Sequence, residues 1–214
     1  MSRRLRESSS SSCSGQPDSV TTNRLEAFSD GVFAIAATLL ILNVVEPGGP
    51  LGQGLLHIWA SYVAYAVSFV TIGVIWINHH GVMAQIAKVD RLFLLVNVIF
   101  LMLIAFIPFP TRLLAEHIMA DGAQAAALAY GITLTGTAIM FNVMWQYAAH
   151  DKRLLRENAS ERAVRGITRS YLPGPFIYLV ATVSAVVSPQ LSAVLYAGIA
   201  LFYVLESSIF GGRA

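Results

Sequence analysis

The sequence predicts an all-α, polytopic membrane protein with six membrane-spanning helices. Of its 214 residues, 56% are apolar and only 12% are charged, whereas a soluble domain averages about 25% charged residues. The apolar residues are gathered in several long blocks, which is typical of a chain that crosses a bilayer repeatedly. We expect the spans at residues 25–45, 55–79, 91–114, 123–149, 173–187 and 191–210.

The distribution of basic residues predicts the orientation of these spans. If the N-terminus is cytoplasmic, all but one of the 14 Lys and Arg residues fall in cytoplasmic segments, and only Arg112 lies at the outer end of a helix. Lys and Arg are enriched in cytoplasmic loops. We therefore expect both termini in the cytoplasm.

Residues 1–20 form a Ser-rich tail with few apolar side chains. Such a segment cannot bury enough apolar surface to fold, so we expect it to be disordered. Residues 21–214 then form a single six-helix domain, and the sequence shows no internal repeat. The only cysteine, Cys13, lies in the tail, so no intramolecular disulfide is possible.

The first predicted span begins with charged side chains. Asp30 precedes an apolar run, residues 31–45, that is broken only by Thr38 and Asn43. At about 1.5 Å per residue this run is too short to cross a bilayer alone, so Asp30 is expected at or just inside the hydrocarbon edge. A carboxylate there is costly, and we interpret it as a functional group with a polar partner.

The second span supplies candidate partners at the same membrane depth, because it returns to the cytoplasmic side. We predict a polar lock between the two spans, since buried polar groups must satisfy one another. Its members are Arg24, Phe28, Ser29, Asp30, Trp76, Asn78 and His79. Two separate interfacial clusters remain an alternative. We expect no metal site from His79 and His80, because adjacent helical residues point about 100° apart.

Four residues of the first span recur at helical spacing. Ile35, Thr38, Leu39 and Leu42 stand at i, i+3, i+4 and i+7, and Gly31 extends the same stripe towards the cytoplasm. Spacing alone does not distinguish a pore lining from a packing face. Other polar residues inside the spans, such as Asn97, are typical of hydrogen bonds between helices.

Several motifs are absent from the sequence. It contains no Thr-Val-Gly-Tyr-Gly filter loop, no phosphate-binding P-loop, no His-Glu-x-x-His zinc helix and no Gly-x-Ser-x-Gly elbow. We therefore expect neither an enzyme nor an ATP-driven machine, and no cofactor or nucleic-acid partner.

One short motif resembles a known family. Residues 24–30 read Arg-Leu-Glu-Ala-Phe-Ser-Asp and match the R-x-x-x-F-S-D signature of the transmembrane protein 175 family of potassium channels. The six-span length and the end of the second span, with Trp76, Asn78 and His79, resemble the single-repeat prokaryotic branch of that family.

The resemblance implies a homotetramer in a prokaryotic plasma membrane, with the first span of each subunit lining a central pore. It implies potassium as the permeant ion and potassium-selective conduction without a filter loop. The same resemblance places the narrowest constriction at Ile35, further apolar rings at Leu39 and Leu42, and a selectivity role at Thr38. Ala34 is a departure, because some members carry a serine there.

A function of another class stays open at this point. A proton-linked secondary transporter would use Asp30, His79 and His80 as a proton relay. Transporters usually show paired repeats and helices broken near the midplane, whereas the first span has no Gly or Pro in its middle. The sequence therefore favours the channel, with the Asp30 cluster as an anchor for the first span.

Overall fold

The computed structural model describes residues 22–44 and 51–210, which are helical apart from turns and one isolated β-bridge. The elements are α1 (Thr22–Leu39), η1 (Leu40–Asn43), α2 (Leu51–His57), α3 (Trp59–Met83), α4 (Arg91–Phe106), α5 (Pro108–His117), α6 (Ala123–Ala149), η2 (His150–Lys152), α7 (Glu161–Tyr171), α8 (Gly174–Ser184) and α9 (Pro189–Phe210). The tail at residues 1–20, which we expected to be disordered, lies outside the described residues.

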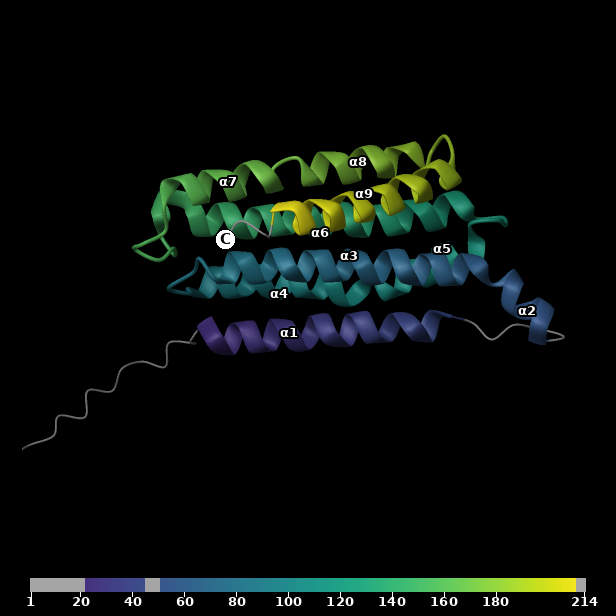
Figure 1. Cartoon of the computed structure of the whole chain (residues 1–214), viewed down its shortest axis with the longest axis horizontal. Coiled ribbons are helices and arrows are strands. Elements are labelled where there is room, and N and C mark those ends of the chain that lie inside the picture. Colours follow the sequence, from purple (N-terminus) through teal and green to yellow (C-terminus); the bar gives the residue numbers. More distant parts are fainter. Residues whose placement is uncertain (1–21, 45–50, 211–214) are drawn as a thin grey trace, which may run out of the picture.

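The long helices run side by side as a layered bundle (Figure 1). Helix α1 forms one edge and packs on α3 and α4. Helices α4 and α5 pack on α6, which in turn packs on α8. Helices α7 and α8 form the opposite edge of the bundle. The pore-lining candidate α1 is therefore an outer element of a single chain, attached to the bundle by one face.

Within the described residues, four helical stretches are long and apolar enough to cross a membrane. They are Thr22–Asn43, Trp59–Met83, Arg91–His117 and Ala123–Lys152. They correspond to the first four predicted spans, and α6 has the boundaries predicted for the fourth. Helix α8 has only 11 residues, and the apolar part of α9, Pro189–Leu205, is also shorter than these four stretches.

Two predicted spans differ in detail from the structure. The second is divided into α2 and α3, and α3 continues to Met83, so His79 and His80 lie within the helix instead of at its end. The third is divided at Ile107 because Pro108 has no backbone N–H with which to continue the α-helical hydrogen bonds. The chain resumes at once as α5, so the membrane crossing is preserved.

Candidate functional site

Helix α1 has two distinct faces. Its buried face comprises Leu25, Ser29, Phe33 and Ala36, and Leu40 of η1 continues it. The opposite face comprises the stripe Gly31, Ile35, Thr38, Leu39 and Leu42, and every one of these residues is exposed in the single chain. Ile35 is 61% exposed and Leu42 is 73% exposed. The chain alone therefore leaves the stripe uncovered.

Thr38 is the polar member of the stripe. Its Oγ1 donates a hydrogen bond to the carbonyl oxygen of Ile35 at 2.9 Å. A hydroxyl group has one proton to donate and two lone pairs that can accept. Since the proton of Thr38 is bound to the backbone, its oxygen can present lone pairs on the exposed face.

A buried hydrogen-bonded chain joins three helices behind this stripe. His79 Nε2 of α3 lies 3.0 Å from Asn97 Oδ1 of α4, and Asn97 Nδ2 donates to Ser29 Oγ of α1 at 3.2 Å. Ser29 Oγ donates in turn to the Leu25 carbonyl at 2.9 Å. His79, Asn97 and Ser29 are each at most 1% exposed. Because the Asn97 oxygen can only accept, His79 Nε2 carries the proton in this arrangement.

Aromatic rings enclose His79 in this chain of contacts. The His79 ring stacks on Phe100 at 5.6 Å with an interplanar angle of 6°, and the Phe33 ring lies 5.5 Å away. Phe33 and Phe100 are themselves buried. The imidazole is therefore held in one orientation by apolar packing as well as by Asn97.

Two less buried contacts join α1 to α3 beside the buried chain. Trp76 Nε1 donates to Asp30 Oδ1 at 2.8 Å, and Glu26 Oε1 lies 2.9 Å from His80 Nδ1. Trp76, His79 and His80 stand at i, i+3 and i+4 of α3 and so share the side that meets α1. The partner of Asp30 is thus an indole N–H.

The structure brings together Ser29, Asp30, Trp76 and His79 from the predicted lock but not its other members. Arg24 and Phe28 are exposed, and within the described residues no hydrogen bond or ion pair of Arg24 is found. Asn78 lies on another side of α3, where its carbonyl accepts a 3.5 Å hydrogen bond from Tyr171. The reason is helical geometry, because each residue is rotated by about 100° from the last.

Three residues that contact this cluster, Asn97, Glu26 and His80, were not members of the predicted lock. Asn97 interrupts the apolar third span, which is a usable signal for a helix-to-helix hydrogen bond. Glu26 lies within the short family signature. Among the described residues, no group of three or more His, Cys, Asp and Glu side chains is arranged to hold a metal ion.

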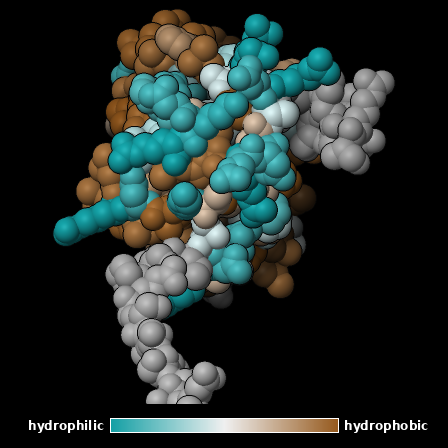
Figure 2. Space-filling view, turned by 90° about the vertical axis from the view of Figure 1, so that its left-hand side faces the viewer, coloured by the Kyte–Doolittle hydropathy of each residue, from teal (hydrophilic) through white to brown (hydrophobic). Residues whose placement is uncertain are grey.

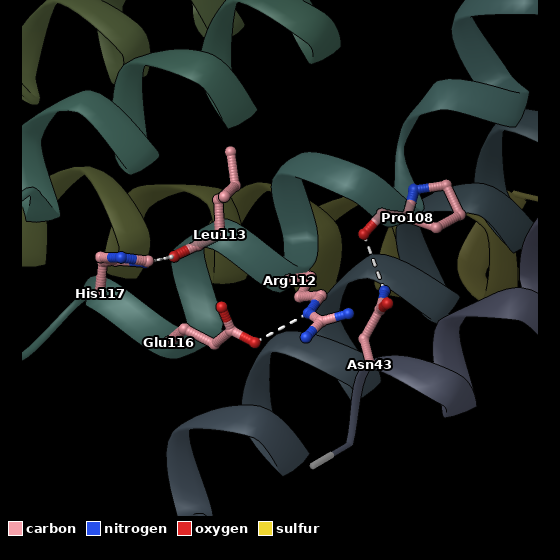
Figure 3. Close-up of polar contacts among 6 residues, drawn as sticks. All are labelled: Asn43, Pro108, Arg112, Leu113, Glu116 and His117. Carbon is pink, nitrogen blue, oxygen red and sulfur yellow. Dashed lines mark hydrogen bonds and ion pairs between the residues drawn. The ribbon is translucent and has the colours of Figure 1, made fainter.

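The other end of the first span has a separate attachment (Figure 3). Asn43 Nδ2 donates to the carbonyl oxygen of Pro108 at 2.7 Å, at the break between α4 and α5. Beside it, Arg112 Nε and Glu116 Oε1 form an ion pair at 2.7 Å within α5. The segment from Thr22 to Asn43 is therefore tied to the bundle at both ends, with the exposed stripe between them.

These features define a polytopic helical membrane protein whose first span presents an uncovered face. Residues 24–108 match the family model described as "Endosomal/lysosomal potassium channel TMEM175". The chain is 40% identical over 198 residues to a potassium channel of Chamaesiphon minutus, an alignment that covers 90% of this chain and 98% of that protein. It is 37% identical to a potassium channel of Streptomyces collinus, with 85% and 91% of the two chains covered.

A solved structure agrees with these sequence relationships. The crystal structure of a lysosomal potassium-selective channel TMEM175 homolog from Chamaesiphon minutus superposes with a TM-score of 0.80, over 87% of this chain and 97% of that chain. The chain therefore belongs to the TMEM175 family, which is a family of ion channels and not of enzymes. The family expected from residues 24–30 is confirmed.

Proposed function

We propose that the protein is a potassium-selective channel of a prokaryotic plasma membrane, in which four copies of the chain surround a pore lined by α1. The observation that carries this proposal is the uncovered stripe on α1, in a chain that is 40% and 37% identical to two bacterial proteins named potassium channels. In a closed symmetric ring each stripe residue stands opposite its own copies. Four stripes would cover one another around the axis.

The apolar stripe residues act as the gate in this proposal. Ile35 forms the narrowest ring, and Leu39 and Leu42 form further rings one and two turns beyond it. An apolar ring narrower than a hydrated ion blocks conduction by excluding water. Opening requires a wider ring, and a rotation or tilt of α1 supplies it.

Thr38 provides the selectivity element. It lies three residues beyond Ile35, and its hydroxyl proton is bonded to the backbone. A ring of four such hydroxyl oxygens offers lone pairs to a partly dehydrated cation. This arrangement replaces the carbonyl filter loop, which is absent from the sequence.

The two C-terminal helices complete six spans in this proposal. Helix α9 has 22 residues, which at about 1.5 Å per residue is long enough to cross the hydrocarbon core of about 30 Å. Helix α8 is short but continues the line of α7 (Figure 1). The last helical hydrogen bond of α7 runs from Leu172 N to Thr168 O and the first of α8 from Ile177 N to Pro173 O, so only a short break separates the two helices. Six spans and the distribution of basic residues place both termini in the cytoplasm.

The contacts behind the stripe act as anchors and not as ion ligands. Ser29 lies on the buried face of α1, where it meets the buried side chain of Asn97 on α4, which in turn bonds the buried His79 on α3. Asp30 is bonded to Trp76 on α3. These hydrogen bonds fix the cytoplasmic half of α1, while the outer end is held by one side-chain hydrogen bond, from Asn43, and by the buried Leu40 side chain. With fewer polar attachments, the outer half is the part with more freedom to tilt.

A proton-linked transporter is less well supported. Asp30 and His80 have separate partners, Trp76 and Glu26, and His79 is bonded to Asn97. No continuous hydrogen-bonded route among Asp30, His79 and His80 is found in the described residues. Membership of a channel family also favours the channel.

Electrical recording from purified protein in liposomes tests the proposal. With potassium on one side and sodium on the other, we expect currents that reverse near the potassium equilibrium potential. A Thr38→Ala variant should reverse nearer to zero, because the hydroxyl ring is lost while the apolar rings remain. Currents without potassium preference, or proton-coupled flux without channel currents, would contradict the proposal.

The assembly has its own test. Light scattering of the detergent-solubilised chain, corrected for bound detergent, should give four times the 23.1 kDa mass of one chain. A mass of one or two chains under conditions that preserve flux would rule out the tetramer.

A further inference from the structure

The structure assigns a second binding surface to the edge of the bundle opposite α1: we infer that Arg162, Arg165 and Arg169 of α7 bind the anionic headgroups of membrane phospholipids. We call these three residues the arginine stripe. They stand at i, i+3 and i+7 of α7 and are all exposed. By helical geometry they span about 10 Å along one side of the helix.

The opposite side of α7 is fixed to the bundle. Val164 and Ile167 pack on the core, Trp145 Nε1 donates to Thr168 Oγ1 at 2.9 Å, and the Tyr171 ring meets Phe141 edge-on at 4.9 Å. The arginine stripe therefore points away from the bundle in one fixed orientation. A preorganised surface loses little conformational entropy when it binds a ligand.

The face that carries the arginine stripe continues along α8 as an apolar surface. Leu172, Phe176, Val180 and Val183 follow Arg169 at helical spacing, and they are between 51% and 67% exposed. Only residues 172 and 173 separate α7 from α8, and Pro173 has helical φ and ψ angles, so the helical spacing carries over approximately from one helix to the next. Because α8 lies at the edge of the bundle opposite α1, this apolar surface faces lipid when α1 lines the pore (Figure 1).

The change from apolar to basic side chains marks the depth of the lipid headgroups. Leu172 and Phe176 lie where acyl chains begin, and Arg169 follows one turn further out. Figure 2 shows hydrophilic side chains across this end of the molecule, with hydrophobic surface beside them. Basic clusters directly cytoplasmic of a membrane helix attract anionic lipids, and arginine binds phosphate oxygens with its planar fork of donors.

The charges around the stripe leave most of it uncompensated. Glu161 contacts Arg165 at 3.6 Å and also Lys152 at 3.5 Å. Arg162 and Arg169 have no acidic partner among the described residues. Two exposed guanidinium groups are therefore available to a phosphodiester.

A lipid titration of the full chain in detergent tests this inference. The thermal unfolding midpoint is followed while phosphatidylglycerol, or phosphatidylcholine with the same acyl chains, is added. We expect phosphatidylglycerol to raise the midpoint more than phosphatidylcholine does. The Arg162→Gln/Arg169→Gln variant should need about 25-fold more phosphatidylglycerol for the same rise, because each of the two lost basic contacts with an anionic membrane is worth about a factor of five.

Two comparisons make the test decisive. The Lys88→Gln/Arg91→Gln variant removes the same charge from exposed positions at the turn between α3 and α4, at the same end of the bundle. It should behave like the parent. Soluble glycerol 3-phosphate should not reproduce the shift, because it lacks the acyl chains that the α8 surface contacts. Equal titrations in the parent and the α7 variant, an equal loss in both variants, or a full response to glycerol 3-phosphate would each overturn the inference.

This inference rests on the membrane placement in the proposed function. The titration requires neither conduction nor orientation, so its failure is distinct from a failure of the liposome recordings.

Discussion

Ile35 combines a large apolar side chain with 61% exposure, while its neighbours Phe33 and Ala36 on the same helix are buried. Such a side chain is covered either by lipid or by another copy of the chain. The two cases differ in what a polar substitution does, because only a pore-facing residue controls access of water to an ion path.

We expect Ile35→Asn to raise basal ion flux and to reduce the preference for potassium over sodium. An amide in the narrowest ring admits water, which lowers the barrier that an apolar ring sets. Flux is measured in liposomes at matched protein density in each cation. Ile132→Asn is the control, since Ile132 is 64% exposed on α6, away from the proposed pore. If both variants conduct like the parent, the stripe on α1 is not the gate.

Asn97 has the opposite character, because it is fully buried and makes hydrogen bonds to two other helices. Asn97→Leu leaves the buried Nε2–H of His79 without its acceptor. The Ser29 hydroxyl loses the bond that it accepts but still donates to the Leu25 carbonyl. Each unsatisfied buried group costs on the order of 1–3 kcal/mol. We expect a lower thermal unfolding midpoint in detergent than for Asn158→Leu, a change at an exposed loop position. Equal midpoints would show that the buried chain contributes little to stability.

At the scale of elements, α6, α8 and α9 approach one another closely at Gly131 of α6. A Cβ placed at this residue would lie 2.0 Å from Tyr196 Oη of α9 and 2.5 Å from Thr182 Oγ1 of α8. Thr182 Oγ1 also accepts the Tyr196 hydroxyl at 3.2 Å. Only the absence of a side chain at position 131 lets the three helices meet through these hydroxyl groups.

Gly131→Ala should therefore destabilise the bundle by about 1–3 kcal/mol, the usual cost of overpacking. The measurement is the thermal midpoint together with the yield of folded protein. Gly136 of the same helix is the matched control, because its Cβ would have its nearest neighbour at 3.9 Å. We expect Gly136→Ala to be neutral or slightly stabilising. A Gly131→Ala variant as stable as Gly136→Ala would mean that α8 and α9 separate without cost.

A second inter-element contact is centred on Asp90, which caps α4 by accepting from Phe93 N at 2.8 Å. Tyr147 of α6 donates to Asp90 Oδ2 at 2.5 Å, and Arg153 lies 3.3 Å from the same oxygen. Burial of this carboxyl acts to raise its pKa, but the hydrogen bonds from Tyr147 and Phe93 and the charge of Arg153 outweigh it, so the pKa of Asp90 is lowered.

A lowered carboxyl pKa stabilises the folded chain above the ordinary pKa of the group, and this contribution is lost as the pH falls through the lowered value. We expect the free energy of unfolding of the parent to fall as the pH is lowered below about 4, the ordinary pKa of an aspartate. Asp90→Asn keeps a helix-capping side chain but removes the titration, so its thermal midpoint should change less over that range. Parallel pH profiles for the two proteins would contradict the role given to Asp90.

At the scale of the whole molecule, α1 and the α7–α8 pair lie at opposite edges of the bundle (Figure 1). One edge presents the stripe proposed to meet other subunits, and the other presents the apolar surface and the arginine stripe proposed to meet lipid. This separation lets assembly and lipid contact occur without competing for surface.

A reporter fused after Ala214 should be active only in its cytoplasmic form, because the distribution of basic residues predicts a cytoplasmic C-terminus. A reporter fused after Gly122, at the turn between α5 and α6, should show the opposite behaviour. The two fusions control for expression, because each should be active with the form of the reporter that is inactive in the other. Periplasmic activity of the Ala214 fusion would overturn the six-span arrangement.

Periodicity and composition were sufficient to predict the helical membrane fold, the boundaries of α6 and the stripe on α1. These features depend on local geometry, because helical rise and rotation are nearly constant along a chain. The short signature at residues 24–30 was likewise enough to indicate the family.

Contacts between helices were decided only by the tertiary structure. Sequence reasoning placed Arg24 and Asn78 in the lock because they share a membrane depth with Asp30. In the structure, the rotation of α3 turns Asn78 towards Tyr171, and Asn97 enters from a third helix. Depth follows from position along the chain, whereas partnership depends on which faces of separate helices meet. Helix packing, which no single span encodes, therefore determined the network that holds α1 in place.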